Sequence, residues 1–66
     1  MDIIINGEPQ ELPAPMTVAA LLEARNLAGK RVAVERNGEI VAKSRHAETL
    51  LAAGDRIEIV VAVGGG

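Results

Sequence analysis

The sequence predicts an α+β fold, in which one helix packs across one face of a mixed sheet of about five strands. Two Asn-Gly pairs, at residues 6–7 and 37–38, each separate two strand-like runs, and this pair is the strongest short signal for a β-hairpin. One helical pattern lies between the two hairpins, and a long apolar run lies near the end of the chain. The predicted order is therefore hairpin, helix, hairpin and last strand.

The first hairpin is predicted over residues 2–12. Three consecutive isoleucines make residues 2–5 a strand, because β-branched side chains favour extended backbone. Residues 8–12 return beside it, and Pro9, which has no N–H to donate, places this second strand at an edge of the sheet.

The helix is predicted to begin after Thr17, whose hydroxyl suits the N-cap position. Val18, Leu21 and Leu22 follow at the spacing of one helix face. The helix is expected to end near Asn26, a residue that tolerates the left-handed conformation required just after a helix.

The second hairpin is predicted from alternation over residues 31–36, with residues 39–43 as the returning strand. The apolar residues of the segment 44–53 show neither helical nor strand periodicity. We expect its two leucines, Leu50 and Leu51, to tuck under the sheet from a single helical turn or a loop.

The most apolar strands, residues 2–5 and 56–63, are expected in the middle of the sheet. They would be parallel, because the long intervening segment supplies the crossover that a parallel pair needs. The face toward the helix would then carry Ile3, Ile5, Ile57, Ile59, Val61 and Val63. The opposite face would carry Ile4, Glu58, Val60 and Ala62.

Composition removes several classes of function. The 66 residues include no cysteine, no aromatic residue and one histidine, and the net charge is −2. Thiol catalysis, a disulfide scaffold and zinc-finger spacing are therefore excluded, and nucleic-acid binding is disfavoured because no aromatic ring is present to stack on a base. No apolar run has the length of a signal peptide or a membrane span, so we expect a cytoplasmic protein without membrane contact.

The sequence 44–46, Ser-Arg-His, is the nearest approach to a catalytic motif. A catalytic triad also needs an orienting acid and an oxyanion site, and neither is evident nearby. One histidine is not a metal site. We therefore interpret these residues as solvated loop positions and predict no catalytic residue, no metal and no enzyme.

The chain ends in three glycines directly after the last strand. We expect a domain over residues 1–63 and a flexible glycine tail over 64–66. An inert terminus is one interpretation, because termini are commonly disordered. The other is that the terminal carboxylate is the working group, since glycines without Cβ atoms pass close to the walls of an enzyme cleft.

Taken together, the turns, the length and the glycine ending resemble the ubiquitin-like β-grasp fold and, within it, the ThiS family of sulfur carriers in thiamin biosynthesis. The resemblance covers the whole chain. It rests on DIIINGE, TVAALLE, VAVERNGEIV, AGDRIEIV and the final VGGG.

The resemblance implies that an E1-like adenylating enzyme activates the carboxylate of Gly66 with ATP, which this chain does not itself bind. The adenylate would become a thiocarboxylate, with sulfur from a donor on the cysteine desulfurase route, and thiazole synthase would take the sulfur. Gly64 and Gly65 would thread the tail into these enzymes. The chain would be a protein co-substrate.

Three other functions remain open from the sequence. A molybdopterin-type sulfur carrier has the same fold and tail but usually a longer chain. A ubiquitin-like modifier would form isopeptide bonds with target lysines. A passive β-grasp binding module would have an inert tail. For the apolar patch expected at Ile4, Val60 and Ala62, partner docking and ordinary surface are both open.

Overall fold

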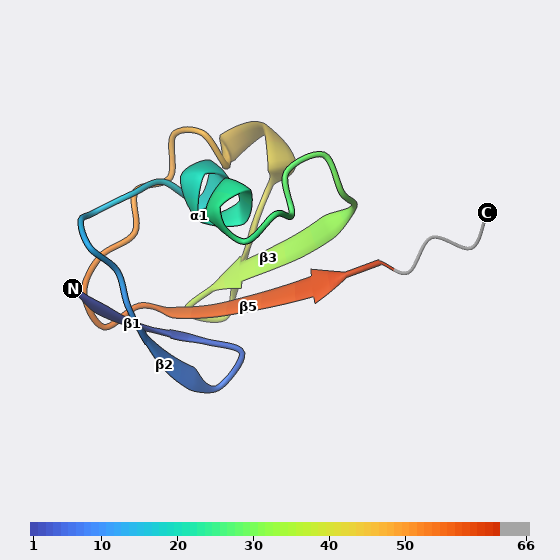
Figure 1. The fold of residues 1–66 in the computed structure, drawn as a ribbon. Helices are drawn as coiled ribbons and strands as arrows, with labels where there is room; N and C mark the ends of the chain where they lie inside the picture. Colours follow the sequence, from blue (N-terminus) through green and yellow to red (C-terminus); the bar gives the residue numbers. More distant parts are fainter. Residues whose placement is uncertain (63–66) are drawn as a thin grey trace.

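The sheet has five strands in the order β2-β1-β5-β3-β4, with one helix across one face (Figure 1). This confirms the predicted mixed sheet with one helix. The structure is a computed structural model and describes residues 1–62. The elements are β1 (Asp2–Ile5), β2 (Glu8–Glu11), α1 (Val18–Ala24), β3 (Val32–Arg36), β4 (Glu39–Val41), the 3₁₀ turn η1 (Lys43–Arg45) and β5 (Arg56–Val61).

The middle of the sheet is a parallel pair, as the sequence predicts. Ile4 and Ile5 of β1 lie in register with Arg56 and Ile57 of β5. Strand β5 also pairs with β3, so it has a neighbour on both sides. Strands β1 and β3 likewise have two neighbours, and β5 lies at the centre of the five.

Asn6 makes the first turn and also extends the sheet beyond it. Its φ of 51° is the left-handed conformation that this turn needs. Its side-chain Oδ1 accepts a hydrogen bond from the Ile59 amide at 2.7 Å, and its Nδ2 donates to the Ile59 carbonyl at 3.2 Å. The Asn6 side chain thus takes the place of the next residue of β1 beside β5.

The helix begins and ends where the sequence predicts. Thr17 is the N-cap, and its hydroxyl accepts a hydrogen bond from the Ala20 amide at 3.1 Å. Asn26 follows the helix with a φ of 61°, and the Leu27 amide then donates to the Leu22 carbonyl at 2.8 Å. This is the hydrogen bond by which a left-handed residue closes a helix end.

Strand β4 is shorter than predicted. It ends at Val41, and Lys43, expected in this strand, begins η1 instead. The reason is tertiary: the segment after β4 leaves the sheet and crosses to the helix, where the His46 carbonyl accepts from the Ala19 amide at 2.9 Å. The start of β3 is therefore left without β4 beside it.

The core lies between the sheet and the helix and is entirely aliphatic. Its buried members are Ile3, Ile5, Leu12, Val18, Leu21, Leu22, Val34, Leu51, Ile57 and Ile59. The prediction for Leu51 is confirmed, but that for Leu50 is wrong, because Leu50 is 57% exposed. Leu50 forms an isolated antiparallel bridge with Thr17, and adjacent residues of extended backbone point to opposite sides.

Candidate functional site

The candidate site is the end of the chain, and β5 is the element that positions it. Ile57 and Ile59 bury this strand in the core at 0% and 7% exposure. The Ala62 amide still donates to the Arg31 carbonyl at 2.9 Å. The segment that follows Ala62 is therefore attached to the central strand of the sheet. Gly64, Gly65 and Gly66 lie outside the described residues.

Around this end, β5 emerges from the core. Val60 is 64% exposed and Val61 is 41% exposed, and Ala62 is exposed as well. Val61 has the same strand parity as the buried Ile57 and Ile59, which agrees with the predicted face. It is nevertheless partly exposed, because it sits at the last position of β5, where burial by the core ends.

The three residues of the predicted docking patch do not lie together. Val60 and Ala62 are two positions apart near the end of β5 and so share a face. Ile4, which is half-buried, lies in register with Arg56. Val60 lies four positions along the strand from Arg56, which is about 13 Å at the usual rise per residue. The patch is therefore Val60 and Ala62, with Ile4 near the other end of the strand.

The opposite end of β5 is anchored by Asp55, which sequence reasoning missed. Its carboxylate is 6% exposed and accepts three hydrogen bonds: from the Ala52 amide at 2.8 Å, from Arg36 Nε at 2.8 Å and from Asn37 Nδ2 at 3.0 Å. Asn37 Oδ1 in turn accepts from the Arg56 amide at 2.9 Å. The carboxylate thus joins the β3–β4 turn to the start of β5.

Burial alone would raise the pKa of Asp55, and it is the largest single influence on this group. The hydrogen bonds from Ala52, Asn37 and Arg36, together with the Arg36 charge, outweigh it and leave the pKa below the ordinary value of 3.8. Hydrogen bonds to the charged form stabilise that form.

We expect this carboxylate to make stability depend on pH. Because the folded-state pKa lies below 3.8, the stabilisation is fully present above that pH and is lost as the pH falls through the folded-state pKa. Asp55→Asn should lower the free energy of unfolding at neutral pH and flatten its decline in acid, as measured by urea unfolding across the pH range. Asp2→Asn, at an exposed carboxylate, is the control. Parallel pH profiles for the parent protein and Asp55→Asn would contradict this role.

The Ser-Arg-His stretch contains a second correction. Ser44 and Arg45 are exposed as expected, but His46 is only 8% exposed. Its Nε2 lies 3.1 Å from the Val41 carbonyl. The hydrogen bond between the Ala19 amide and the His46 carbonyl holds this residue against the helix, and nothing in the local sequence signals that contact.

Within residues 1–62, no three His, Asp or Glu side chains come close enough together to hold a metal ion. In the same part of the chain, no helix is long and apolar enough to cross a membrane.

The strand order, the single helix across one face and the glycine run after the central strand define a small β-grasp protein of the ubiquitin-like class. The ThiS family model matches residues 3–66. The chain therefore belongs to the ThiS family.

Solved structures agree with the fold. The crystal structure of the thiamine biosynthesis protein ThiS from Geobacter metallireducens superimposes with a TM-score of 0.85 and 32% identity, over 100% of both chains. The sulfur carrier protein ThiS of Bacillus subtilis is 50% identical over 50 residues, which is 76% of each chain.

Longer relatives also match. A thiazole synthase of Paramagnetospirillum magneticum is 48% identical over the whole of this chain, which spans 20% of that relative's length. A thiazole synthase of Magnetococcus marinus is 39% identical, again over the whole of this chain and 20% of that relative's length. In both relatives, a segment matching this entire chain is part of a protein named for thiazole synthesis.

Proposed function

We propose that this chain carries sulfur as a thiocarboxylate on Gly66 and delivers it to a thiazole synthase. An E1-like adenylating enzyme joins the Gly66 carboxylate to the α-phosphate of ATP and releases pyrophosphate. A sulfide equivalent from the cysteine desulfurase route then adds to the acyl carbon, and AMP leaves. The product is a thiocarboxylate, which is a better nucleophile than the carboxylate it replaces.

The observation that carries this proposal is the placement of the glycine run, which begins three positions after the end of β5 at Val61. The strand is anchored on both sides, while three extended residues reach about 10 Å. Such a tail enters a narrow cleft while the domain stays outside. With no cysteine in the chain, sulfur has no side-chain thiol to occupy. Membership of the ThiS family supports the thiamin route over the molybdopterin route.

Two relatives support thiazole synthase as the acceptor, because each combines a segment like this chain with a longer protein of that name. Chemistry supports an activating step, since a free carboxylate does not exchange oxygen for sulfur without activation. The E1-like adenylating enzyme and the cysteine desulfurase route are proposed from the resemblance to the ThiS family. We propose that the reactions take place in the cytoplasm.

The test is an intact mass spectrum of the protein after co-expression with the adenylating enzyme and a cysteine desulfurase. We expect a mass gain equal to the exchange of one oxygen for one sulfur, located in the C-terminal peptide. An unchanged mass, with the enzyme shown to be active and the tail intact, would support the passive binding module instead.

We also propose that Val60 and Ala62, with a smaller contribution from Ile4, contact the adenylating enzyme beside the tail. Val60→Asp should raise the KM of adenylation about tenfold, because it puts a charge into an apolar contact. Ile40→Asp is the matched control, since Ile40 is 79% exposed and lies on the edge strand β4. Equal KM values for the two variants would contradict a docking role for Val60.

A further inference from the structure

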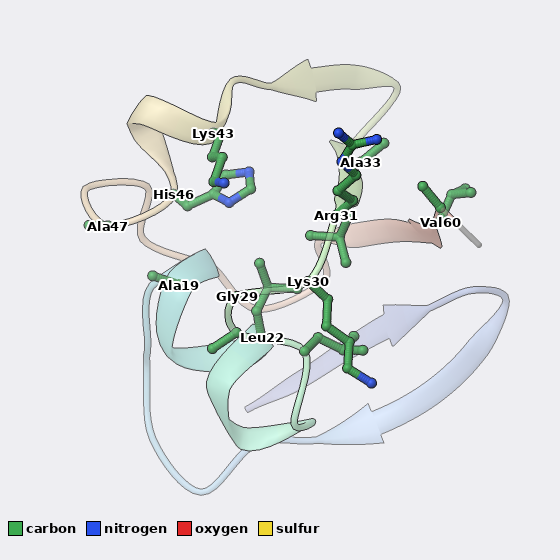
Figure 2. Close-up of a pocket in the computed structure, with 14 residues that line it drawn as sticks. Ala19, Leu22, Gly29, Lys30, Arg31, Ala33, Lys43, His46, Ala47 and Val60 are labelled. Atoms are coloured by element: carbon green, nitrogen blue, oxygen red, sulfur yellow. The ribbon is translucent and has the colours of Figure 1, made fainter. Parts of the chain in front are cut away.

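A groove of about 530 Å³ lies between the end of α1, the start of β3 and η1 (Figure 2). Leu22 and Leu27 line it from the helix end, and Ala47 lines it from the segment after η1. Val60 and Ala62 lie at its border. The sulfur-carrying chemistry proposed for the tail leaves most of this groove unexplained.

One wall of the groove is an unpaired strand edge. The Ala62 amide donates to the Arg31 carbonyl, and the Asn37 amide donates to the Arg56 carbonyl. Main-chain groups alternate sides along an antiparallel strand, so the N–H and C=O of Val32 point away from β5. Strand β4 covers that side only from Val34 onward. Within residues 1–62, the Val32 main chain therefore has no strand partner there.

The charged side chains that line the groove are all positive. Lys30 and Arg31 lie on the loop that enters β3, and Lys43 comes from η1 on the other side (Figure 2). Among the described residues, no aspartate or glutamate lines the groove, although acidic residues outnumber basic ones in the chain by nine to seven. The groove therefore complements an anionic partner.

His46 adds a hydrogen-bond acceptor. Its Nε2 lies 3.1 Å from the Val41 carbonyl, which can only accept, so Nε2 carries the proton of this hydrogen bond. In the tautomer with its proton on Nε2, Nδ1 accepts hydrogen bonds. Within residues 1–62, no group donates to Nδ1, and the His46 side chain lines the groove.

We propose that this groove binds an extended segment of a partner protein with alternating aliphatic and acidic residues, which adds a strand to the β3 edge. Main-chain groups of the segment would pair with Val32, and an N–H group of the segment would donate to His46 Nδ1. Its aliphatic side chains would enter the apolar groove, while its carboxylates would face Lys30 and Lys43. Strand addition of this kind takes affinity from the main chain and specificity from alternate side chains.

A fatty-acid-like anion would use the apolar wall and the lysines. It has no main-chain donors or acceptors for Val32, so the observations favour a peptide. The proposal goes beyond sulfur carriage, because binding needs no activation of Gly66. Its failure in the test below would leave the mass-spectrometric test of the tail unaffected.

The test is a titration of the full ¹⁵N-labelled chain, followed by amide chemical shifts. The probe is a short, end-capped peptide that alternates valine and glutamate. Two comparison ligands are titrated separately: the same peptide with lysine in place of glutamate, and decanoate. We expect the glutamate peptide to shift the amides of Val32, Lys43 and Ala47 and to slow solvent exchange at the Val32 amide. The lysine peptide should do neither.

Charge variants sharpen the test. The double variant Lys30→Glu and Lys43→Glu should weaken binding of the glutamate peptide at least about tenfold, whereas Arg56→Glu, an exposed cation outside the groove, should change it less than about twofold. An unchanged spectrum at millimolar glutamate peptide would overturn the proposal. Shifts with decanoate alone, without slower exchange at Val32, would assign the groove to a lipid anion and also overturn it.

Discussion

Removing Gly65 and Gly66 is expected to abolish thiocarboxylate formation while leaving the fold intact. The shortened chain still ends in a glycine carboxylate, at Gly64, so the reacting group is unchanged. What is lost is reach, about 7 Å for two extended residues, and the carboxylate no longer meets the α-phosphate of ATP. Productive alignment requires reacting atoms about 3 Å apart, so a shortfall of this size removes the reaction rather than slowing it.

The measurement is the same intact mass spectrum, together with pyrophosphate release by the adenylating enzyme. Gly64→Ala is the matched control, because it keeps the length of the tail, and it should retain most of the activity. The free energy of unfolding should change by less than about 0.5 kcal/mol in both variants, since the core residues all lie between Ile3 and Ile59. Full activity of the shortened chain would show that the glycines are an inert terminus.

Ile57→Ala is expected to cause the largest loss of stability. Ile57 is 0% exposed and lies on the central strand beside Ile5 of β1. Truncating a buried isoleucine typically costs about 2–5 kcal/mol, through lost transfer free energy and the cavity left behind. A domain of this length has a total stability of only about 3–10 kcal/mol, so the variant should lose a large fraction of its stability.

Urea unfolding monitored by far-ultraviolet circular dichroism measures this loss, since the chain has no aromatic fluorophore. Ile40→Ala removes the same side-chain atoms at a position that is 79% exposed, and it should stay within about 0.5 kcal/mol of the parent. A loss below about 1 kcal/mol for Ile57→Ala, with an unchanged urea dependence, would contradict a core centred on β5.

The two Asn-Gly turns, the Thr17 cap and the helix end at Asn26 were all predictable. Each depends on the conformational preference of one or two residues, such as the left-handed φ that asparagine and glycine tolerate. Pro9 likewise indicated an edge strand through a missing N–H. The apolar strand at the end of the chain indicated the centre of the sheet, because the most apolar strands of a sheet tend to lie in its middle.

The glycine ending is also a property of the sequence alone, and together with the turn motifs it indicates the ThiS family. Family membership is confirmed by the match over residues 3–66. The roles of Gly64, Gly65 and Gly66 stay predictions.

Only the tertiary structure decided which side chains are buried, and which contacts they make, in the segment from Val41 to Asp55. It placed Leu50 outside and Leu51 inside, buried His46 and surrounded Asp55 with donors from Arg36, Asn37 and Ala52. These outcomes depend on contacts between residues far apart in the chain, and a propensity or a local period carries no information about such contacts. Local backbone chemistry thus determined the turns and the helix, whereas long-range packing decided where β4 stops and, with it, which edge of β3 is open.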